Sequence, residues 1–131
     1  MGFANRGAQS SGGAALALGL FTGGTKLVFA TAAGANNNVN FGGAFPAASV
    51  GRVDVNTGAG IANITGIVAP SVDGQGLLIR NTGANSLTLN SQNAGSTAAN
   101  QLVFSSDLIL NQNDTIILVY DLALALWVIS E

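Results

Sequence analysis

The sequence predicts an all-β protein built as a sandwich or a barrel. Short runs of apolar residues alternate with clusters of Gly, Asn, Ser and Thr, and these turn signals recur every eight to twelve residues. That spacing is typical of all-β sandwiches and barrels. No segment combines helical apolar periodicity with a good helix cap. At 131 residues the chain has the length of one domain, and we identify no interdomain linker and no tandem repeat.

The expected strands follow one another from residue 26 to the C-terminal end. Val53 and Val55 alternate with polar neighbours, as the residues of a half-buried strand do. Two hairpins are expected, one at "TGA" (82–84), where Gly83 can adopt a positive φ, and one at "QN" (112–113). The expected strands lie within residues 26–31, 51–57, 76–81, 86–90, 107–111, 115–121 and 126–130.

Residues 1–24 are expected to form an extended N-terminal arm in front of a β-sandwich domain at residues 25–131. The segment is rich in Gly, Ala and Ser, and its glycines would weaken a helix. Its large apolar side chains indicate that it docks onto another protein or a neighbouring subunit, whereas a frayed tail is the alternative. The residues expected to make these contacts are Arg6, Leu16, Leu18, Leu20 and Phe21.

The charge content argues against two classes of partner. Charged residues make up 8% of the chain, against roughly 25% in an ordinary soluble domain, and the net charge is −2. Without a basic patch to contact phosphates, nucleic-acid binding is not expected. The longest apolar-leaning run near the start, residues 14–21, is far shorter than the roughly 20 residues of a membrane span, so no membrane partner is expected. Its length also suits a signal peptide, but Arg6 alone makes a poor basic segment.

The residue types needed for most enzymatic chemistry are absent. The chain has no His and no Cys, which excludes a Ser-His-Asp triad, an imidazole base, thiol catalysis and an ordinary zinc site. Asp107, Asp114 and Asp121 are spaced seven apart and are expected in turns, where Asp accepts hydrogen bonds from backbone N–H groups. We therefore expect no enzyme and no cofactor. A calcium site that includes Asp54, Asp73 or Asp114 stays as a minor alternative.

Two other features have a structural interpretation. Tyr120 and Trp127 lie inside apolar strands, so we expect them in the core rather than as exposed platforms for a sugar. The stretch "STAAN" (96–100) is expected to form a corner between two sheets. Its Ser and Thr would bond nearby backbone groups, its alanines would form one helical turn, and Asn100 would close that turn.

Six motifs follow one another along the chain. They are "NNNVNFGG" (36–43), "NITGI" (63–67), "DGQGLLIRNTGANSLTLN" (73–90), "NAGSTAANQL" (93–102), "DLILNQNDTIILVYD" (107–121) and "LWVIS" (126–130). Their order resembles a family of small β-sandwich modules in tailed-bacteriophage structural proteins, which occur in tail-fibre tips, head-fibre tips and capsid decoration proteins. The resemblance covers about residues 25–131 and implies a jelly-roll-like antiparallel β-sandwich, usually assembled as a homotrimer, without catalytic residues.

The expected function is that of a non-enzymatic virion structural protein, most simply a capsid decoration (cement) protein on the particle surface. Its expected partners are further copies of itself and the major capsid protein or another virion protein. The alternative is a tail-fibre or head-fibre tip that binds the host surface, where a glycan would be a further partner. An enzyme such as a glycan depolymerase is the third hypothesis, and the missing His and unpaired carboxylates argue against it.

Two segments predict how copies assemble. Residues 115–120, "TIILVY", form an almost continuous apolar run, so both faces of that strand should be covered, which favours a homotrimer. Leu122, Leu124 and Leu126 stand where related modules turn with short polar residues. We expect these leucines to be covered in the trimer interface or against the shell or fibre protein. The alternative is a longer strand pair with the leucines in the sandwich core.

Overall fold

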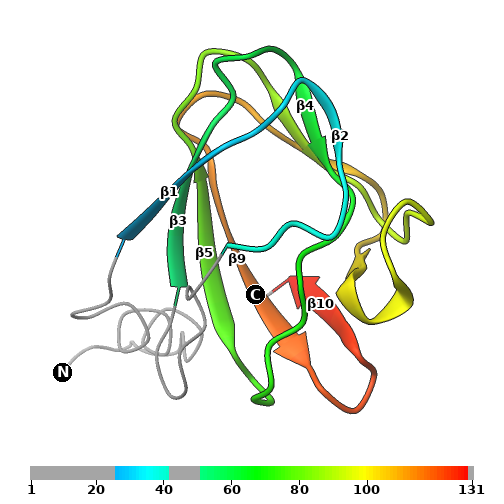
Figure 1. The fold of residues 1–131 in the computed structure, drawn as a ribbon. Coiled ribbons are helices and arrows are strands. Elements are labelled where there is room, and N and C mark those ends of the chain that lie inside the picture. Colours follow the sequence, from blue (N-terminus) through cyan, green and yellow to red (C-terminus); the bar gives the residue numbers. More distant parts are fainter. Residues whose placement is uncertain (1–25, 42–50, 130–131) are drawn as a thin grey trace, which may run out of the picture.

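The chain forms an all-β fold, as the sequence predicts. The computed structural model describes residues 26–41 and 51–129, and these contain ten strands and one short 3-10 helix (Figure 1). The strands are β1 (Lys26–Ala30), β2 (Gly34–Asn36), β3 (Gly51–Asn56), β4 (Ala62–Ile64), β5 (Gly76–Asn81), β6 (Leu87–Leu89), β7 (Leu102–Val103), β8 (Leu108–Leu110), β9 (Thr115–Asp121) and β10 (Leu126–Ile129); the helix η1 is Ala98–Asn100.

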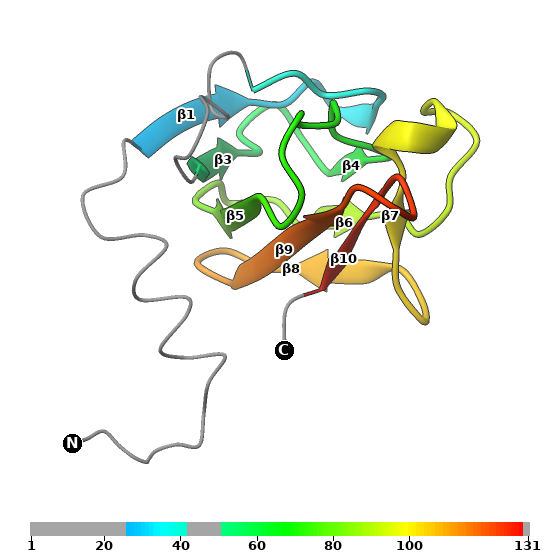
Figure 2. The ribbon, with the colours of Figure 1, turned by 90° about the horizontal axis from the view of Figure 1, so that it is seen from below.

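The strands form two facing sheets, and the chain winds between them in stacked coils. The six-stranded sheet has the order β1-β3-β5-β9-β10-β7, and the four-stranded sheet has the order β2-β4-β6-β8. The pairs β1–β2, β3–β4 and β5–β6 each contribute one strand to either sheet, and equivalent strands pair in parallel. Figure 2 shows β1, β3 and β5 as successive layers. This winding is that of a β-solenoid.

One strand of each sheet runs against the coils. Strand β9 pairs antiparallel with β5, and β8 pairs antiparallel with β6. Strand β10 then pairs antiparallel with β9 and parallel with β7, which extends the six-stranded sheet on that side. The stack therefore carries additional strands at its C-terminal end.

The expectation of an antiparallel jelly-roll sandwich is wrong. Five of the eight strand pairs are parallel, whereas a jelly roll is built from antiparallel ones. Residues 82–84 and 112–113 are not hairpin turns, because β5 and β6 lie in different sheets, as do β8 and β9. Both segments are corners that carry the chain from one sheet to the other. Gly83 is not among the residues with a positive φ.

The expectation of no repeat is also corrected by the strand register. Leu27, Val53 and Ile79 are register partners on successive coils of the six-stranded sheet. The corners of the second and third coils both contain the tetrapeptide Asn-Thr-Gly-Ala, at residues 56–59 and 81–84. The chain is therefore an array of coils of similar length, of the kind that buries a continuous core only when neighbours stack.

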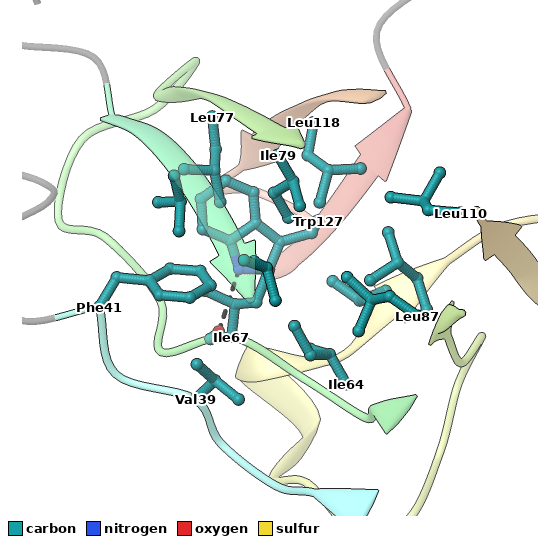
Figure 3. Close-up of a cluster of buried hydrophobic side chains, with 14 of the residues drawn as sticks. Val39, Phe41, Ile64, Ile67, Leu77, Ile79, Leu87, Leu110, Leu118 and Trp127 are labelled. Atoms are coloured by element: carbon teal, nitrogen blue, oxygen red, sulfur yellow. Dashed lines mark hydrogen bonds between the residues drawn. The ribbon is translucent and has the colours of Figure 1, made fainter. Parts of the chain in front are cut away.

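The core fills the space between the sheets. Trp127 of β10 lies at its centre, between side chains of both sheets, and its Nε1 donates a hydrogen bond to the Ile67 carbonyl at 3.0 Å (Figure 3). Its ring packs edge-on against Tyr120, with 5.1 Å between ring centroids, and the Tyr120 hydroxyl donates to the Ala99 carbonyl at 2.8 Å. Both aromatic residues are buried, so the prediction that they belong to the core is confirmed.

The corner that follows β5 depends on a glycine and a buried amide. A Cβ atom on Gly83 would lie 2.2 Å from the backbone nitrogen of Thr57, so only glycine lets the two corners stack this closely. The buried Asn81 side chain donates to the carbonyls of Asn85 and Leu110, both at 2.9 Å, and accepts from the Gly83 amide at 3.0 Å. One side chain thus joins the corner to the end of β8.

Residues 91–101 cross from the four-stranded to the six-stranded sheet, as the sequence predicts, with the alanines of "STAAN" in the helical turn η1. The expected hydrogen bonds to nearby backbone groups are replaced by bonds to the first coil. The Asn38 amide donates to Ser96 Oγ at 2.8 Å, and Asn38 Oδ1 accepts from the Thr97 amide at 2.8 Å and from Asn100 Nδ2 at 2.9 Å. Asn38 adopts a positive φ of 46°, which Asn tolerates better than most residues.

Candidate interaction surface

The outward side of the six-stranded sheet carries a group of half-buried apolar side chains. Alternation along β9 places Leu118 and Tyr120 in the core, so Ile117 and Val119 point outward. No strand of residues 26–41 or 51–129 lies over this side of the sheet. We call the group the outer-face patch; its members are Leu78, Val103, Ile117, Val119, Leu126 and Val128.

The strand register makes the outer-face patch continuous. Val119, Val128 and Val103 are successive register partners across β9, β10 and β7. Leu78 of β5 stands opposite Ile117, which is two residues before Val119 on the same side of β9. Directly opposite side chains on one side of an antiparallel pair have Cβ atoms about 4.5–5.5 Å apart, which places Val119 beside Val128 and Leu78 beside Ile117. The patch therefore spans four neighbouring strands.

The same side of the sheet is charged over β1 and β3. Asp54 points outward between Val53 and Val55, yet it is only 6% exposed. Its carboxylate lies 3.7 Å from Lys26 Nζ and 3.5 Å from Arg52 Nε. Arg80 is its register partner on β5 and donates to Asn113 Oδ1 at 2.9 Å. The three cations of the described ranges thus share one side of the molecule, next to the outer-face patch.

The turn between β9 and β10 presents leucines to solvent. Leu122 is 48% exposed and Leu124 is 64% exposed, so the alternative that placed them in the core is wrong for these two residues. Two carboxylates fix the turn: Asp73 Oδ1 accepts from the Leu122 amide, and Asp121 Oδ1 accepts from the Leu124 amide, each at 2.9 Å. We call Leu122 and Leu124 the leucine tip.

The sequence-predicted contact residues fall into three groups. Leu122 and Leu124 form the leucine tip, and Leu126 belongs to the outer-face patch beside it. The other five, Arg6, Leu16, Leu18, Leu20 and Phe21, lie outside the described residues.

Three members of the outer-face patch were missed by sequence reasoning. Ile117 and Val119 belong to the apolar run that predicted a covered face. Leu78, Val103 and Val128 carry no such signal, because a sequence does not tell which strands are neighbours. The recurrence of Asn-Thr-Gly-Ala at residues 56–59 and 81–84 indicates stacked coils, but it does not give the strand register, in which Arg52 is the partner of Leu78.

The turn carboxylates act as the sequence predicts. Asp107 Oδ1 accepts from the Ser91 amide at 2.7 Å and its Oδ2 from Asn90 Nδ2 at 2.9 Å, while Asp114 Oδ2 accepts from the Asn111 amide at 2.8 Å. The Ser91 bond, with a smaller contribution from Asn90, holds the pKa of Asp107 below its ordinary value, against a weak opposing effect of desolvation. Burial raises the pKa of the Tyr120 hydroxyl, which matches its place in the core.

Residues 26–41 and 51–129 lack two further features. Within these ranges no three His, Cys, Asp or Glu side chains come together in a way that could hold a metal ion. Among the same residues no helix is both long enough and apolar enough to cross a membrane.

Comparison with known proteins returned no relative. No family model, no curated protein and no solved structure matches this chain.

Proposed function

We propose that this protein is a non-enzymatic structural protein of a bacteriophage particle, which assembles with copies of itself and with another virion protein. The observation that carries the assembly is the outer-face patch, which continues across four strands and is covered by no described strand. Burial of apolar surface is the main favourable contribution to protein association, at roughly 25 cal/mol per Å². The bacteriophage origin rests on the six ordered motifs.

The assembly we propose is a homotrimer. The outer-face patch would supply its apolar centre, and the neighbouring group of Lys26, Arg52 and Asp54 would lie at its rim. The leucine tip extends from the same hairpin as Val119 and Val128, so one partner can cover both. Light scattering on the purified full chain tests this proposal. A trimer mass at micromolar concentration is expected, and a stable monomer at that concentration would contradict it.

The place we propose first on the particle is the capsid surface, as a decoration protein bound to the major capsid protein. Such a protein is present in hundreds of copies, since it follows the capsid lattice. Quantitative mass spectrometry of purified particles measures the copy number. A value of a few dozen or fewer would reject the capsid and favour a tail or fibre.

One feature of the fold favours the second candidate, a tail-fibre or head-fibre tip. Stacked parallel coils build a module along one axis in which each coil pairs with its neighbours, as suits the end of a fibre. At such a tip a host-surface glycan would be the ligand. Binding of the purified chain to host cells, abolished by enzymatic removal of surface glycans, would support this candidate. Particle attachment without cell binding would support the capsid location.

A further inference from the structure

One part of the six-stranded sheet is positively charged. The three cations of the described residues lie on β1, β3 and β5 and face outward, and we call them the basic strip: Lys26, Arg52 and Arg80. Asp54 lies among them, so three cations and one carboxylate give this area a net charge of +2. The Lys26 and Arg52 side chains are 51% and 41% exposed, so a partner can reach both. Val28, the register partner of Asp54, adds an exposed apolar side chain.

The leucine tip carries the opposite charge. Asp73 and Asp121 accept the amide hydrogen bonds that fix the turn, and their carboxylates therefore lie beside the two exposed leucines. Two carboxylates give the tip a charge of −2, equal in size and opposite in sign to that of the basic strip. The tip is thus both apolar and acidic, whereas the basic strip is cationic with an apolar neighbour.

The tip of one chain is too far from its own basic strip to pair with it. Lys26 and Arg52 lie on β1 and β3, and β5 separates both strands from β9 (Figure 1). Neighbouring strands are about 4.8 Å apart, which puts β9 about 14 Å from β1. Arg80 stands opposite Thr115, at the other end of β9 from the tip. Both charged surfaces therefore remain available to a second copy of the chain.

A ring of three copies requires two different surfaces on each copy, because every interface in such a ring is heterologous. We propose that the leucine tip of one copy docks onto the basic strip of the next copy, and that this contact, repeated three times, closes the trimer. The carboxylates of the tip then face the cations of the strip, and the two leucines cover Val28. The outer-face patch adjoins both surfaces and supplies the centre of the ring. This inference rests on the homotrimer proposed above.

Opposite charge favours this pairing over contacts of like with like. Tip against tip, or strip against strip, would bring charges of the same sign together, which is costly across an interface. Attraction between the two surfaces also speeds the encounter of two copies. The contact should therefore depend on ionic strength, because salt screens exposed charges.

The sign of a charge placed at the tip tests the docking surface. Leu124→Lys and Leu124→Glu are compared in the full chain, because both remove the same exposed leucine and differ only in the sign of the added charge. Against the basic strip, Leu124→Lys should raise the midpoint concentration for dissociation of the trimer at least about tenfold above that of Leu124→Glu at low salt. Light scattering over a dilution series measures both midpoints. The difference should shrink at 1 M salt, where the screening length falls to about 3 Å.

The matched control places the same two charges on the other sheet. Ile109 is an exposed outward residue of β8, and Ile109→Lys and Ile109→Glu should both assemble like the natural chain. Thermal unfolding shows that each variant is folded before its association is compared.

A change on the strip identifies the surface that the tip meets. Val28→Glu alone should weaken association, because it adds an anion where the acidic tip docks. Combined with Leu124→Lys in the same chain it should restore most of the lost association, since each Glu then faces the Lys of another copy. Within one chain the two residues lie on β1 and beyond the end of β9, so they cannot pair with each other.

The possible failures are distinguishable. A natural chain that stays monomeric at micromolar concentration rejects the proposed homotrimer, and this contact with it. A natural trimer in which Leu124→Lys and Leu124→Glu dissociate at the same midpoint rejects the contact alone. Weaker association of Leu124→Glu than of Leu124→Lys would place the tip against an acidic surface and would also overturn the inference. So would a double variant that associates no better than Leu124→Lys.

Discussion

The two sheets share one core but differ in the sides that they turn outward. On the four-stranded sheet the outward residues in register are Ala35, Asn63, Thr88 and Ile109, so the row is small or polar except at its edge. On the six-stranded sheet the outward side carries the outer-face patch. One side of an antiparallel sheet commonly faces water with polar residues, whereas a sheet covered on both sides is apolar on both.

This difference separates stability from assembly. The polar row lets the four-stranded sheet face solvent, so changes there should leave association intact. The outer-face patch adds little to the core but presents apolar surface that a partner would cover, so changes there should act on association. Substitutions at a corner where the two sheets meet should instead lower the stability of the whole fold.

The largest effect is expected at the corner that joins the sheets, where Gly83→Ala forces a Cβ atom against the Thr57 backbone. Backbone cannot yield as a flexible side chain can, so the variant should lose about 1–3 kcal/mol or more of unfolding free energy. Gly58→Ala is the matched control, because Gly58 holds the same place in the other Asn-Thr-Gly-Ala corner. Its Cβ would meet only the Asn56 side chain at 3.1 Å, so a change within about 0.5 kcal/mol is expected.

Urea denaturation of both glycine variants measures the difference. Equal destabilisation by Gly83→Ala and Gly58→Ala would show that the close stacking of corners does not limit stability. If Gly83→Ala lost assembly but kept its free energy of unfolding, the corner that joins the sheets would act on association, which is the role assigned to the outer-face patch.

The second effect is expected at the centre of the outer-face patch. Val119→Asp places a charge among apolar neighbours, and a partner that covers the patch would remove this charge from water. The free energy of association should therefore weaken by at least about 2 kcal/mol, the scale of an interface hot spot. Thr88→Asp is the control, an outward residue on a central strand of the four-stranded sheet. Light scattering should show dissociation of the first variant alone. Equal behaviour of the two variants would mean that the outward sides do not differ in function.

Seven of the ten strands of the described residues were predictable from the sequence, whereas β2, β4 and β7 and the pairing of the strands were not. Apolar alternation located β3, because burial of one side leaves a period of two whatever the neighbour is, and a continuous apolar run located β9. The pairing failed at Thr82–Ala84, where a glycine between two strands was interpreted as a hairpin turn. A hairpin and a corner between sheets use the same residue types. Only the recurrence of Asn-Thr-Gly-Ala at residues 56–59 and 81–84 distinguishes a stack of coils.

The candidate surface was predictable where it depended on one strand alone. The run at residues 115–120 indicated that both sides of β9 are apolar, and Ile117 and Val119 do point outward. The leucines at the turn after β9 were expected from the sequence to be covered by a partner, and Leu122 and Leu124 are exposed in the single chain. Val103 and Val128 were not, since they join the patch only through long-range strand pairing.

The leucine tip provides a smaller effect. Leu122→Ser, Leu124→Ser and Leu126→Ser together should leave the subunit folded, because the first two side chains are exposed and the third is only half-buried. Assembly should fail, since the hairpin loses its apolar contacts to a partner. Thermal unfolding and light scattering measure the two properties, with Ala123→Ser as the control. Unfolding would contradict the exposed tip, and a folded triple variant that still assembles would mean that no partner covers these leucines.

The smallest effect is expected at Asp107, which joins the ends of β6 and β8 in the polar, four-stranded sheet through Ser91 and Asn90. Its pKa in the folded chain lies below the ordinary value of 3.8, so the carboxylate stabilises the fold fully above that value. The stabilisation is lost as the pH falls from 3.8 through the lower folded pKa. Asp107→Asn has no carboxylate to protonate at this position. The free energy of unfolding of this variant should therefore fall less steeply below pH 3.8 than that of the natural chain. Ser106→Ala, a change at the adjacent exposed residue, should keep the natural slope. Urea midpoints measured as the pH is lowered test this, and parallel curves for the natural chain and Asp107→Asn would show that the hydrogen bonds of Asp107 add nothing to the stability of this edge. Association through the outer-face patch should respond to neither variant, because Asp107 belongs to the opposite sheet.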